Sequence, residues 1–146
     1  MPRVRVNLTI DAPIDDVWRL VRDVEAYPEY MENVETVAVT ADDGAGHREV
    51  AWSVLLKGSV LEWQQSETVF AEQFRIEFQQ LDGDLDRFDG YWQLDDVDGA
   101  TEAELLVDFE IGVPLLAAML NPVAERALED NSKAMLLALE SRSVAR

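Results

Sequence analysis

The stretch RVRVNLTIDAPIDDVWRLV, residues 3–21, decides the start of the fold because its hydrophobic period changes once, at Pro13. Before Asp11 every second residue is apolar, which predicts a strand with one buried face. Asp11 is expected to cap the helix that follows, and proline is tolerated in a first helical turn. The helical spacing of the next apolar residues predicts a helix from about Pro13 to Val24.

After the first helix the sequence predicts a second short helix and then a sheet. A second short helix is predicted at Tyr27–Met31, because Pro28 suits its opening turn. From Glu35 to Ile111 the period is that of strands, separated by turn signals at residues 42–46, 57–58, 82–84 and 98–99. Six strands in succession predict an antiparallel meander. Its predicted inner face is rich in large side chains, among them Trp52, Leu56, Trp63, Phe74, Phe78, Phe88, Trp92, Phe109 and Ile111.

Helical spacing returns after Gly112. Asn121-Pro122 is a favourable start for a long helix that ends near Ser141, and residues 115–120 are expected to form a separate short turn. The helix has an apolar stripe that also includes Asn131 and Ser132; its apolar members are Ala124, Ala127, Leu128, Met135, Ala138 and Leu139. The order of elements predicts an α+β fold, in which a curved seven-stranded antiparallel sheet wraps around the long C-terminal helix, with two short helices after the first strand.

Length, composition and charge limit the function. The 146 residues are 48% hydrophobic, which fits one domain over residues 1–146 with a core of its own. The 12 Lys+Arg against 30 Asp+Glu give a formal charge of −18, which disfavours binding to nucleic acid or to anionic lipid. The longest apolar run is too short to span a bilayer and no signal peptide is evident, so a cytoplasmic protein without membrane insertion is expected. A homodimer is left open.

The residue inventory also limits the chemistry. There is no cysteine, which excludes disulfides, thiolate nucleophiles and cysteine-based zinc sites. His47 is the single histidine, so neither a Ser/His/Asp triad nor a metal site built from several histidines is expected. Neither a metal ion nor a cofactor is expected. A strongly curved sheet is not filled by one helix with many alanines, which predicts an apolar cavity for a hydrophobic small molecule; a solid aromatic core is the alternative.

Four short motifs carry a family resemblance. Residues 10–18, IDAPIDDVW, and 23–30, DVEAYPEY, resemble the opening of the polyketide cyclase/dehydrase family of START-like, helix-grip proteins. Residues 90–92 and 130–132 are similar to that family too. The resemblance covers essentially the whole chain and implies the helix-grip fold, also called Bet v1-like, with a deep apolar cavity between sheet and C-terminal helix. Because the superfamily also contains coenzyme Q-binding proteins, aromatase/cyclases and hormone receptors, the resemblance does not decide the function.

The resemblance also implies a set of catalytic positions. Arginines on two neighbouring cavity strands and a tyrosine orient the poly-β-keto substrate in the aromatic polyketide cyclases that this chain resembles. With Glu62-Trp63 as the anchor of the alignment, the arginine positions fall on Glu67 and Gln80, and the tyrosine position falls on Val34. The chain therefore departs from that family's mechanism at all of these positions.

Glu67 and Asn131 are the candidate catalytic residues. Glu67 shares strand parity with Trp63, so it is predicted to face inward unless a bulge intervenes or it lies at the cavity mouth. An isolated buried carboxylate has a raised pKa and suits a general acid or base. The Asn131 amide, within an apolar stripe, would hold a ligand carbonyl or bond to backbone. The expected ligand-binding residues are Tyr30, Trp52, Trp63, Gln65, Phe74, Phe78, Gln80, Trp92, Phe109, Leu128 and Met135.

Two functions fit these features. The first is a cyclase or dehydratase acting on a hydrophobic poly-carbonyl substrate, in which the cavity holds a flexible chain in a reactive fold and Glu67 transfers a proton. The alternative is a non-enzymatic carrier or chaperone of a quinone, isoprenoid or other lipid, which needs only the apolar cavity.

Overall fold

The computed structural model describes residues 3–56, 59–110 and 114–144, with the side chains of 56, 59 and 114–124 outside the description. Expectations for the 57–58 turn and for the side chains of Leu56, Ile111 and Ala124 therefore lie outside the described residues. The elements are β1 (Arg3–Ile10), α1 (Ile14–Arg22), the 3-10 helix η1 (Val24–Glu29), β2 (Val34–Asp42), β3 (His47–Leu56), β4 (Ser59–Phe70), the 3-10 helix η2 (Ala71–Gln73), β5 (Arg75–Gly83), β6 (Arg87–Val97), β7 (Ala100–Glu110) and α2 (Pro114–Val144).

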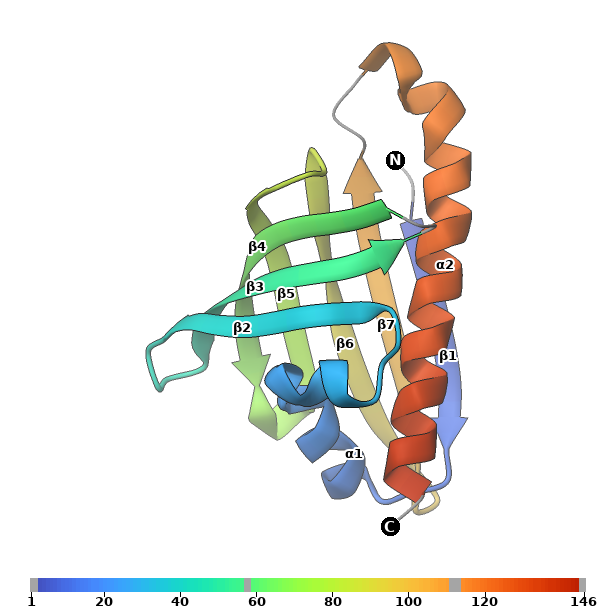
Figure 1. Ribbon diagram of the computed structural model, residues 1–146. Coiled ribbons are helices and arrows are strands. Elements are labelled where there is room, and N and C mark those ends of the chain that lie inside the picture. The colour runs from blue at the N-terminus through green and yellow to red at the C-terminus, as the bar shows by residue number, and fades with distance from the viewer. Residues whose placement is uncertain (1–2, 57–58, 111–113, 145–146) are drawn as a thin grey trace.

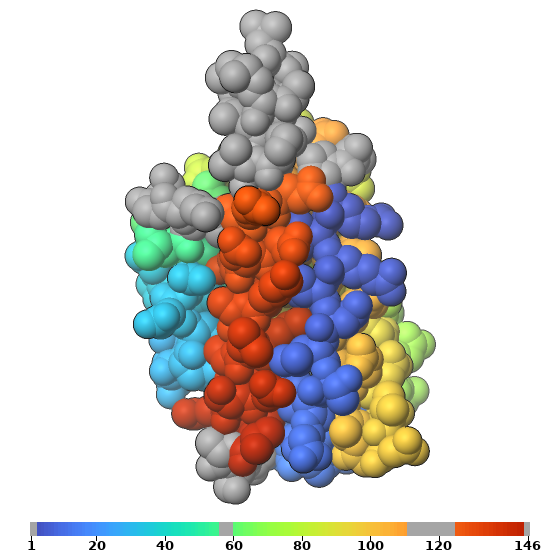
Figure 2. Space-filling view, turned by 90° about the vertical axis from the view of Figure 1, so that its right-hand side faces the viewer, coloured from blue at the N-terminus to red at the C-terminus, as the bar shows by residue number. Residues whose placement is uncertain are grey.

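The seven strands form one antiparallel sheet in the order β1-β7-β6-β5-β4-β3-β2. Strands β2 to β7 follow one another as the predicted meander, and β1 pairs with β7 at one edge. Figure 1 shows the sheet curving around α2, with α1 and η1 covering one end. In Figure 2, α2 lies between the two edge strands, β1 on one side and β2 on the other. The predicted helix-grip architecture is confirmed.

The pairing of β1 with β7 shows how the alternating sequence builds this sheet. Val6 lies opposite Leu105, and both side chains are buried on the inner face. On the outer face, Arg3 lies opposite Asp108 and donates two hydrogen bonds to its carboxylate, at 2.7 and 3.0 Å. Arg5 forms an ion pair with Glu104, which lies diagonally across the same two strands. The apolar half of the pattern therefore faces α2, and the charged half faces solvent in pairs.

The first helices differ from the prediction in their boundaries. Helix α1 begins at Ile14, and its N-cap residue is Pro13, which is extended and makes no side-chain cap bond. The predicted cap by Asp11 is wrong, because that residue lies two positions before the N-cap. Helix α1 ends at Arg22, and η1 starts at Val24, so the chain turns sooner than the helical spacing suggested.

Helix α2 is longer than predicted. It runs from Pro114 to Val144 over 31 residues, so the expected separate turn at 115–120 and the start near Pro122 are wrong. A proline inside a helix removes one backbone hydrogen bond, and the bonds on either side keep a long helix continuous. At the other end, Ser143 Oγ donates to the Leu139 carbonyl at 2.8 Å, two residues beyond the predicted end.

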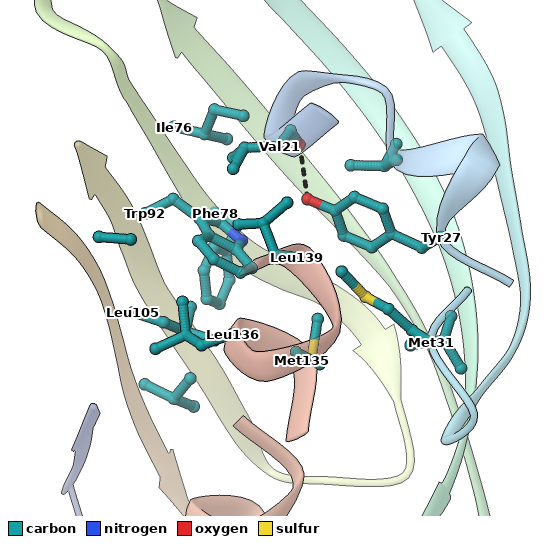
Figure 3. Packing of buried hydrophobic residues seen from close by; sticks show 14 of the residues in the cluster. Val21, Tyr27, Met31, Ile76, Phe78, Trp92, Leu105, Met135, Leu136 and Leu139 are labelled. Atoms are coloured by element: carbon teal, nitrogen blue, oxygen red, sulfur yellow. Dashed lines mark hydrogen bonds between the residues drawn. The ribbon is translucent and has the colours of Figure 1, made fainter. Parts of the chain in front are cut away.

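The core lies where α2 meets the inner face of the sheet. Figure 3 shows Leu136 and Leu139 of α2 pointing toward Trp92 and Leu105 of the sheet. Tyr27 closes the core from η1; it is fully buried, and its hydroxyl donates to the Val21 carbonyl at 2.5 Å. Burial is the main reason that the pKa of Tyr27 is raised well above its ordinary value. The tyrosine therefore fixes η1 to the end of α1.

Candidate functional site

An apolar cavity of about 50 Å³ lies between α2 and the inner face of the sheet. From α2 the lining contains Leu128, Asn131, Ser132 and Met135, a spacing that places one face of the helix toward the sheet. The strands β3 to β7 supply the rest of the described lining: Trp52, Val54, Leu61, Trp63, Gln65, Phe78, Phe88, Trp92, Leu105 and Val107. This is the position at which the sequence predicted a cavity.

Aromatic rings form a continuous wall of this cavity. Trp52 and Trp63 lie opposite each other on β3 and β4, and their rings are stacked with centroids 5.9 Å apart and planes 3° apart. Phe88 of β6 continues the wall, with its ring centroid 4.8 Å from that of Trp63. The ring centroid of Phe78 lies 5.8 Å from that of Phe88. Flat apolar surfaces of this kind favour ligands that contain rings.

The volume of the cavity is small for such a ligand. Pockets for drug-sized molecules have volumes of about 300–1,000 Å³, whereas this cavity measures about 50 Å³. The structure thus lies between the predicted open cavity and the alternative of a solid core. A ligand with one or more rings can enter only if side chains of the wall change rotamer or α2 shifts relative to the sheet.

Two polar atoms next to the cavity have no hydrogen-bond partner among the described residues. They are Oδ1 of Asn131 and Nε1 of Trp52. Asn131 is 8% exposed and Trp52 is 7% exposed. The other Asn131 amide atom, Nδ2, donates to Met135 Sδ at 3.6 Å, a weak acceptor. Buried polar groups without partners are rare and call for a specific explanation.

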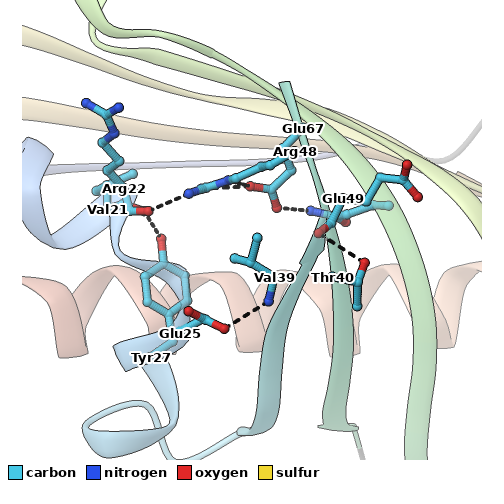
Figure 4. A network of polar contacts seen from close by, with 10 residues as sticks. Val21, Arg22, Glu25, Tyr27, Val39, Thr40, Arg48, Glu49 and Glu67 are labelled. Atoms are coloured by element: carbon cyan, nitrogen blue, oxygen red, sulfur yellow. Dashed lines mark hydrogen bonds and ion pairs between the residues drawn. The ribbon is translucent and has the colours of Figure 1, made fainter. Parts of the chain in front are cut away.

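Gln65 and Glu67 of β4 belong to a polar chain whose members all have partners. Trp63 Nε1 donates to Gln65 Oε1 at 2.7 Å, and Gln65 Nε2 donates to Glu67 Oε2 at 2.6 Å. Arg48 of β3 lies opposite Glu67, with its Nε 2.9 Å and its Nη2 2.8 Å from Glu67 Oε1. Figure 4 shows Arg48 continuing to the Arg22 carbonyl, to which its Nη1 donates at 3.0 Å.

Glu67 is therefore buried as strand parity predicted, but it is not isolated. It is 3% exposed and is paired with a cation, and it is not among the described residues that line the cavity. The expectation of an isolated carboxylate facing a ligand is wrong, because the register of β3 and β4 sets Arg48 directly opposite. The pair instead connects the sheet to the last turn of α1.

The other expected ligand-binding residues divide into two groups. Those that line the cavity are Trp52, Trp63, Gln65, Phe78, Trp92, Leu128 and Met135. Tyr30, Phe74, Gln80 and Phe109 lie elsewhere among the described residues. Sequence reasoning left out Val54, Leu61, Phe88, Leu105, Val107 and Ser132, although their alternation already placed the strand residues on the inner face.

Phe74 and Gln80 lie elsewhere because of local structure. Phe74 precedes β5 in the left-handed region, with φ of 54°, and its ring packs edge-on against Trp18 at 5.8 Å. Gln80 donates from Nε2 to the Leu85 carbonyl at 2.6 Å and holds the connection between β5 and β6. Phe109 is fully buried in the core.

Tyr30 lies at the end of η1, away from the cavity. Its ring faces Tyr27 at 6.2 Å, and the Arg142 guanidinium of α2 lies 5.3 Å from its ring centroid. Burial is the main reason that the pKa of Tyr30 is raised above its ordinary value. Its hydroxyl is buried without a partner among the described residues.

The described part of the chain offers neither a metal site nor a membrane-spanning helix. No group of three or more His, Asp or Glu side chains is placed to hold a metal ion there. Within the same ranges, the helices are too short or too polar to cross a membrane.

Comparison with known proteins assigns the family. Residues 10–136 match the family described as "Polyketide cyclase / dehydrase and lipid transport", so the chain belongs to that family. No curated protein matches the chain.

Solved structures agree with this assignment. A protein of Thermus thermophilus is 29% identical, with a TM-score of 0.91 over 99% of this chain and 98% of that chain. The Zhui aromatase/cyclase of a Streptomyces species is 25% identical, with a TM-score of 0.86 over 97% of this chain and 92% of that one. A START superfamily protein of Mycobacterium smegmatis, at 16% identity and a TM-score of 0.83 over 98% and 97%, shares the fold.

Proposed function

We propose that this protein binds a hydrophobic small molecule between the sheet and α2 and acts as its carrier. The observation that supports this most strongly is the chemistry of the lining: none of the described lining residues is ionisable. Residues 111–124, the segment before the described side chains of α2, contain no ionisable residue in their sequence either. Such a surface favours apolar ligands and offers no group that exchanges protons near neutral pH.

The paired state of Glu67 supports the same proposal. A general acid or base must reach the reacting atom within hydrogen-bond distance, directly or through one water. The carboxylate oxygens of Glu67 are occupied by Arg48 and by the Gln65 amide. Glu67 was the reason to expect an enzyme that transfers protons, and in this proposal its role is structural.

A cyclase or dehydratase is the second candidate, and the likeness to the Streptomyces aromatase/cyclase favours it. In this case the cavity would act mainly by confinement, which can contribute about 7–11 kcal/mol by holding reacting groups together. Asn131 would hold a ligand oxygen, and proton transfer would fall to solvent or to the substrate itself. The enzyme requires a poly-carbonyl substrate, whereas the carrier requires only a hydrophobic ligand.

Cavity filling tests whether the ligand binds at this site. The neutral fluorescent probe N-phenyl-1-naphthylamine is titrated into the natural chain and into Val107→Phe, which adds a ring to the cavity wall. Val37→Phe is the matched control, because Val37 is buried on β2 but is outside the described lining. Overpacking costs each variant about 1–3 kcal/mol of stability, so circular dichroism must show that both are folded.

The proposal predicts that Val107→Phe weakens probe binding at least about tenfold, while Val37→Phe leaves it nearly unchanged. Equal binding by both variants would place the probe elsewhere and contradict the proposed site. Native mass spectrometry of protein purified from its own host then separates the two functions. A co-purified quinone, isoprenoid or other lipid supports the carrier, and a cyclised poly-carbonyl product supports the enzyme.

A further inference from the structure

The two unpartnered atoms of the cavity come from opposite walls. Asn131 lies on α2 and Trp52 lies on β3, and both side chains line the same small cavity. One atom is an amide oxygen, which accepts hydrogen bonds, and the other is an indole N–H, which only donates. A ligand group that reached both atoms would meet one acceptor and one donor.

The orientation of the Asn131 amide follows from its neighbour on α2. Its NH2 group donates to the Met135 sulfur at 3.6 Å, which leaves the oxygen as the unpartnered atom. The reverse orientation would place two electron-rich atoms, the amide oxygen and the sulfur, against each other and would lose this bond. The unpartnered atom that α2 contributes beside the cavity is therefore an acceptor, which needs a donor as its partner.

Trp52 adds the complementary requirement. Its ring is held by the stack on Trp63 and by the edge of Tyr27, at centroid distances of 5.9 and 5.7 Å. The indole N–H of the partner tryptophan, Trp63, is already bonded to Gln65, whereas that of Trp52 has no partner among the described residues. The two stacked tryptophans thus differ in that only Trp52 has a donor to offer.

We propose that the ligand carries a hydroxyl group that donates to Asn131 Oδ1 and accepts from Trp52 Nε1. This inference rests on the proposed function and narrows its ligand to hydrophobic alcohols or phenols. A hydroxyl is the small uncharged group that both donates and accepts, while a ketone, quinone or ether oxygen only accepts. A carboxylate is disfavoured because the described lining contains no cation, and the nearby Arg48 is paired with Glu67.

Three probes with the same ring system test the proposal: 2-naphthol, 2-methoxynaphthalene and naphthalene. Calorimetric titrations are made with the natural chain and with Asn131→Leu, which keeps the approximate size of the side chain and removes the acceptor. Leu128→Met is the control, because it is a volume-conserving change of an apolar lining residue on α2 that keeps both Asn131 and Met135. Both 2-naphthol and the ether can accept from Trp52, so the one additional hydrogen bond, from the naphthol hydroxyl to Asn131, predicts that the natural chain binds 2-naphthol about five- to tenfold more tightly than the ether.

In Asn131→Leu this preference should fall to within about threefold, with naphthalene binding retained or improved. Leu128→Met should keep the preference for 2-naphthol. Equal binding of all three probes to the natural chain would overturn the hydroxyl proposal and leave the proposed function standing. Equal binding of naphthol and ether, both above naphthalene, would overturn it in favour of an acceptor-only ligand. Failure of all three to bind would contradict the proposed function itself.

Discussion

Two ends of the protein interior differ in how their buried polar groups are partnered: the end around Glu67 of β4, and the cavity beside α2. At one end Gln65, Glu67 and Arg48 form a chain in which each member has partners, and the chain ends on the backbone of α1. Toward α2 the surroundings are aromatic, and the Trp52 indole nitrogen and the Asn131 amide oxygen have no partners among the described residues. A buried network whose members pair with one another stabilises one structure, whereas unpartnered atoms cost stability unless a ligand satisfies them.

The largest expected effect is at the paired end. Glu67→Gln removes one charge of an ion pair whose side chains are 2% and 10% exposed, so Arg48 is left buried without a counter-charge. The free energy of unfolding, measured by urea titration, should fall by about 3–5 kcal/mol. Binding of a neutral probe should be nearly unchanged, since this carboxylate does not line the cavity.

Glu77→Gln is the matched control for this change. Glu77 pairs with Arg75 on the outer face, where the two side chains are 49% and 27% exposed, so its loss should cost less than about 1 kcal/mol. If Glu67→Gln were as mild as this control and yet abolished turnover of a poly-carbonyl substrate, the structural role would be wrong. The carboxylate would then be catalytic, and the contrast between the two ends would fail.

The pair of Arg48 with Glu67 also shows how far sequence reasoning can go. Strand parity predicted that Glu67 faces inward, but parity gives the direction of a side chain and not its partner. The partner was accessible from the sequence, because counting outward from the predicted turn at residues 57–58 sets Trp52 opposite Trp63 and Arg48 opposite Glu67. The register of a short hairpin is fixed by the position of its turn.

Other features could not be predicted in this way. The left-handed backbone of Phe74 breaks the alternation that assigned it to a strand, and only the packing on Trp18 reveals its position. The cavity volume depends on the rotamers of large rings such as Trp63, which a hydrophobic pattern does not specify. The sequence thus predicted the sheet, its inner face and the site of the cavity. It predicted neither the ion-pair partner of Glu67 nor the volume of the cavity.

The second expected effect concerns Gln65, the member of the paired chain that also lines the cavity. Gln65→Leu removes the acceptor for Trp63 Nε1 and a donor to Glu67, so two buried groups lose a partner. The free energy of unfolding should fall by about 1–3 kcal/mol. Gln79→Leu, at an exposed position of β5, should change it by less than about 0.5 kcal/mol. Equal effects of the two variants would show that the polar chain adds no stability.

The third effect has the opposite sign. Asn131→Leu replaces a buried amide, whose oxygen has no partner among the described residues, by an apolar side chain. Chemical unfolding should show a gain of about 1 kcal/mol. Ser141→Leu, at an exposed position of α2, measures how much of this gain in stability comes from helix propensity alone. A loss of stability in Asn131→Leu would mean that the amide is already satisfied, which removes the contrast on which the hydroxyl proposal depends.

The smallest effect is expected on the outer face, where polar pairs are exposed. Hydrogen bonds from Arg3 lower the pKa of Asp108 below its ordinary value. A lowered carboxyl pKa stabilises the folded state above the unfolded pKa of about 3.9, and this contribution is lost as the pH falls through the lower folded pKa. The difference in melting temperature between the natural chain and Arg3→Met should therefore be constant above about pH 5 and shrink on acidification below it.

Salt distinguishes this outer pair from the buried one. The Arg3 side chain is 61% exposed, so its effect on the melting temperature should fade as the Debye length drops from about 30 Å at 0.01 M to about 3 Å at 1 M salt. The destabilisation by Glu67→Gln should persist at the higher salt concentration, since buried charges are screened much less. The opposite result would be a change in melting temperature for Arg3→Met that persists at 1 M salt, together with one for Glu67→Gln that vanishes there. It would mean that the outer pair, and not the buried pair, stabilises the fold.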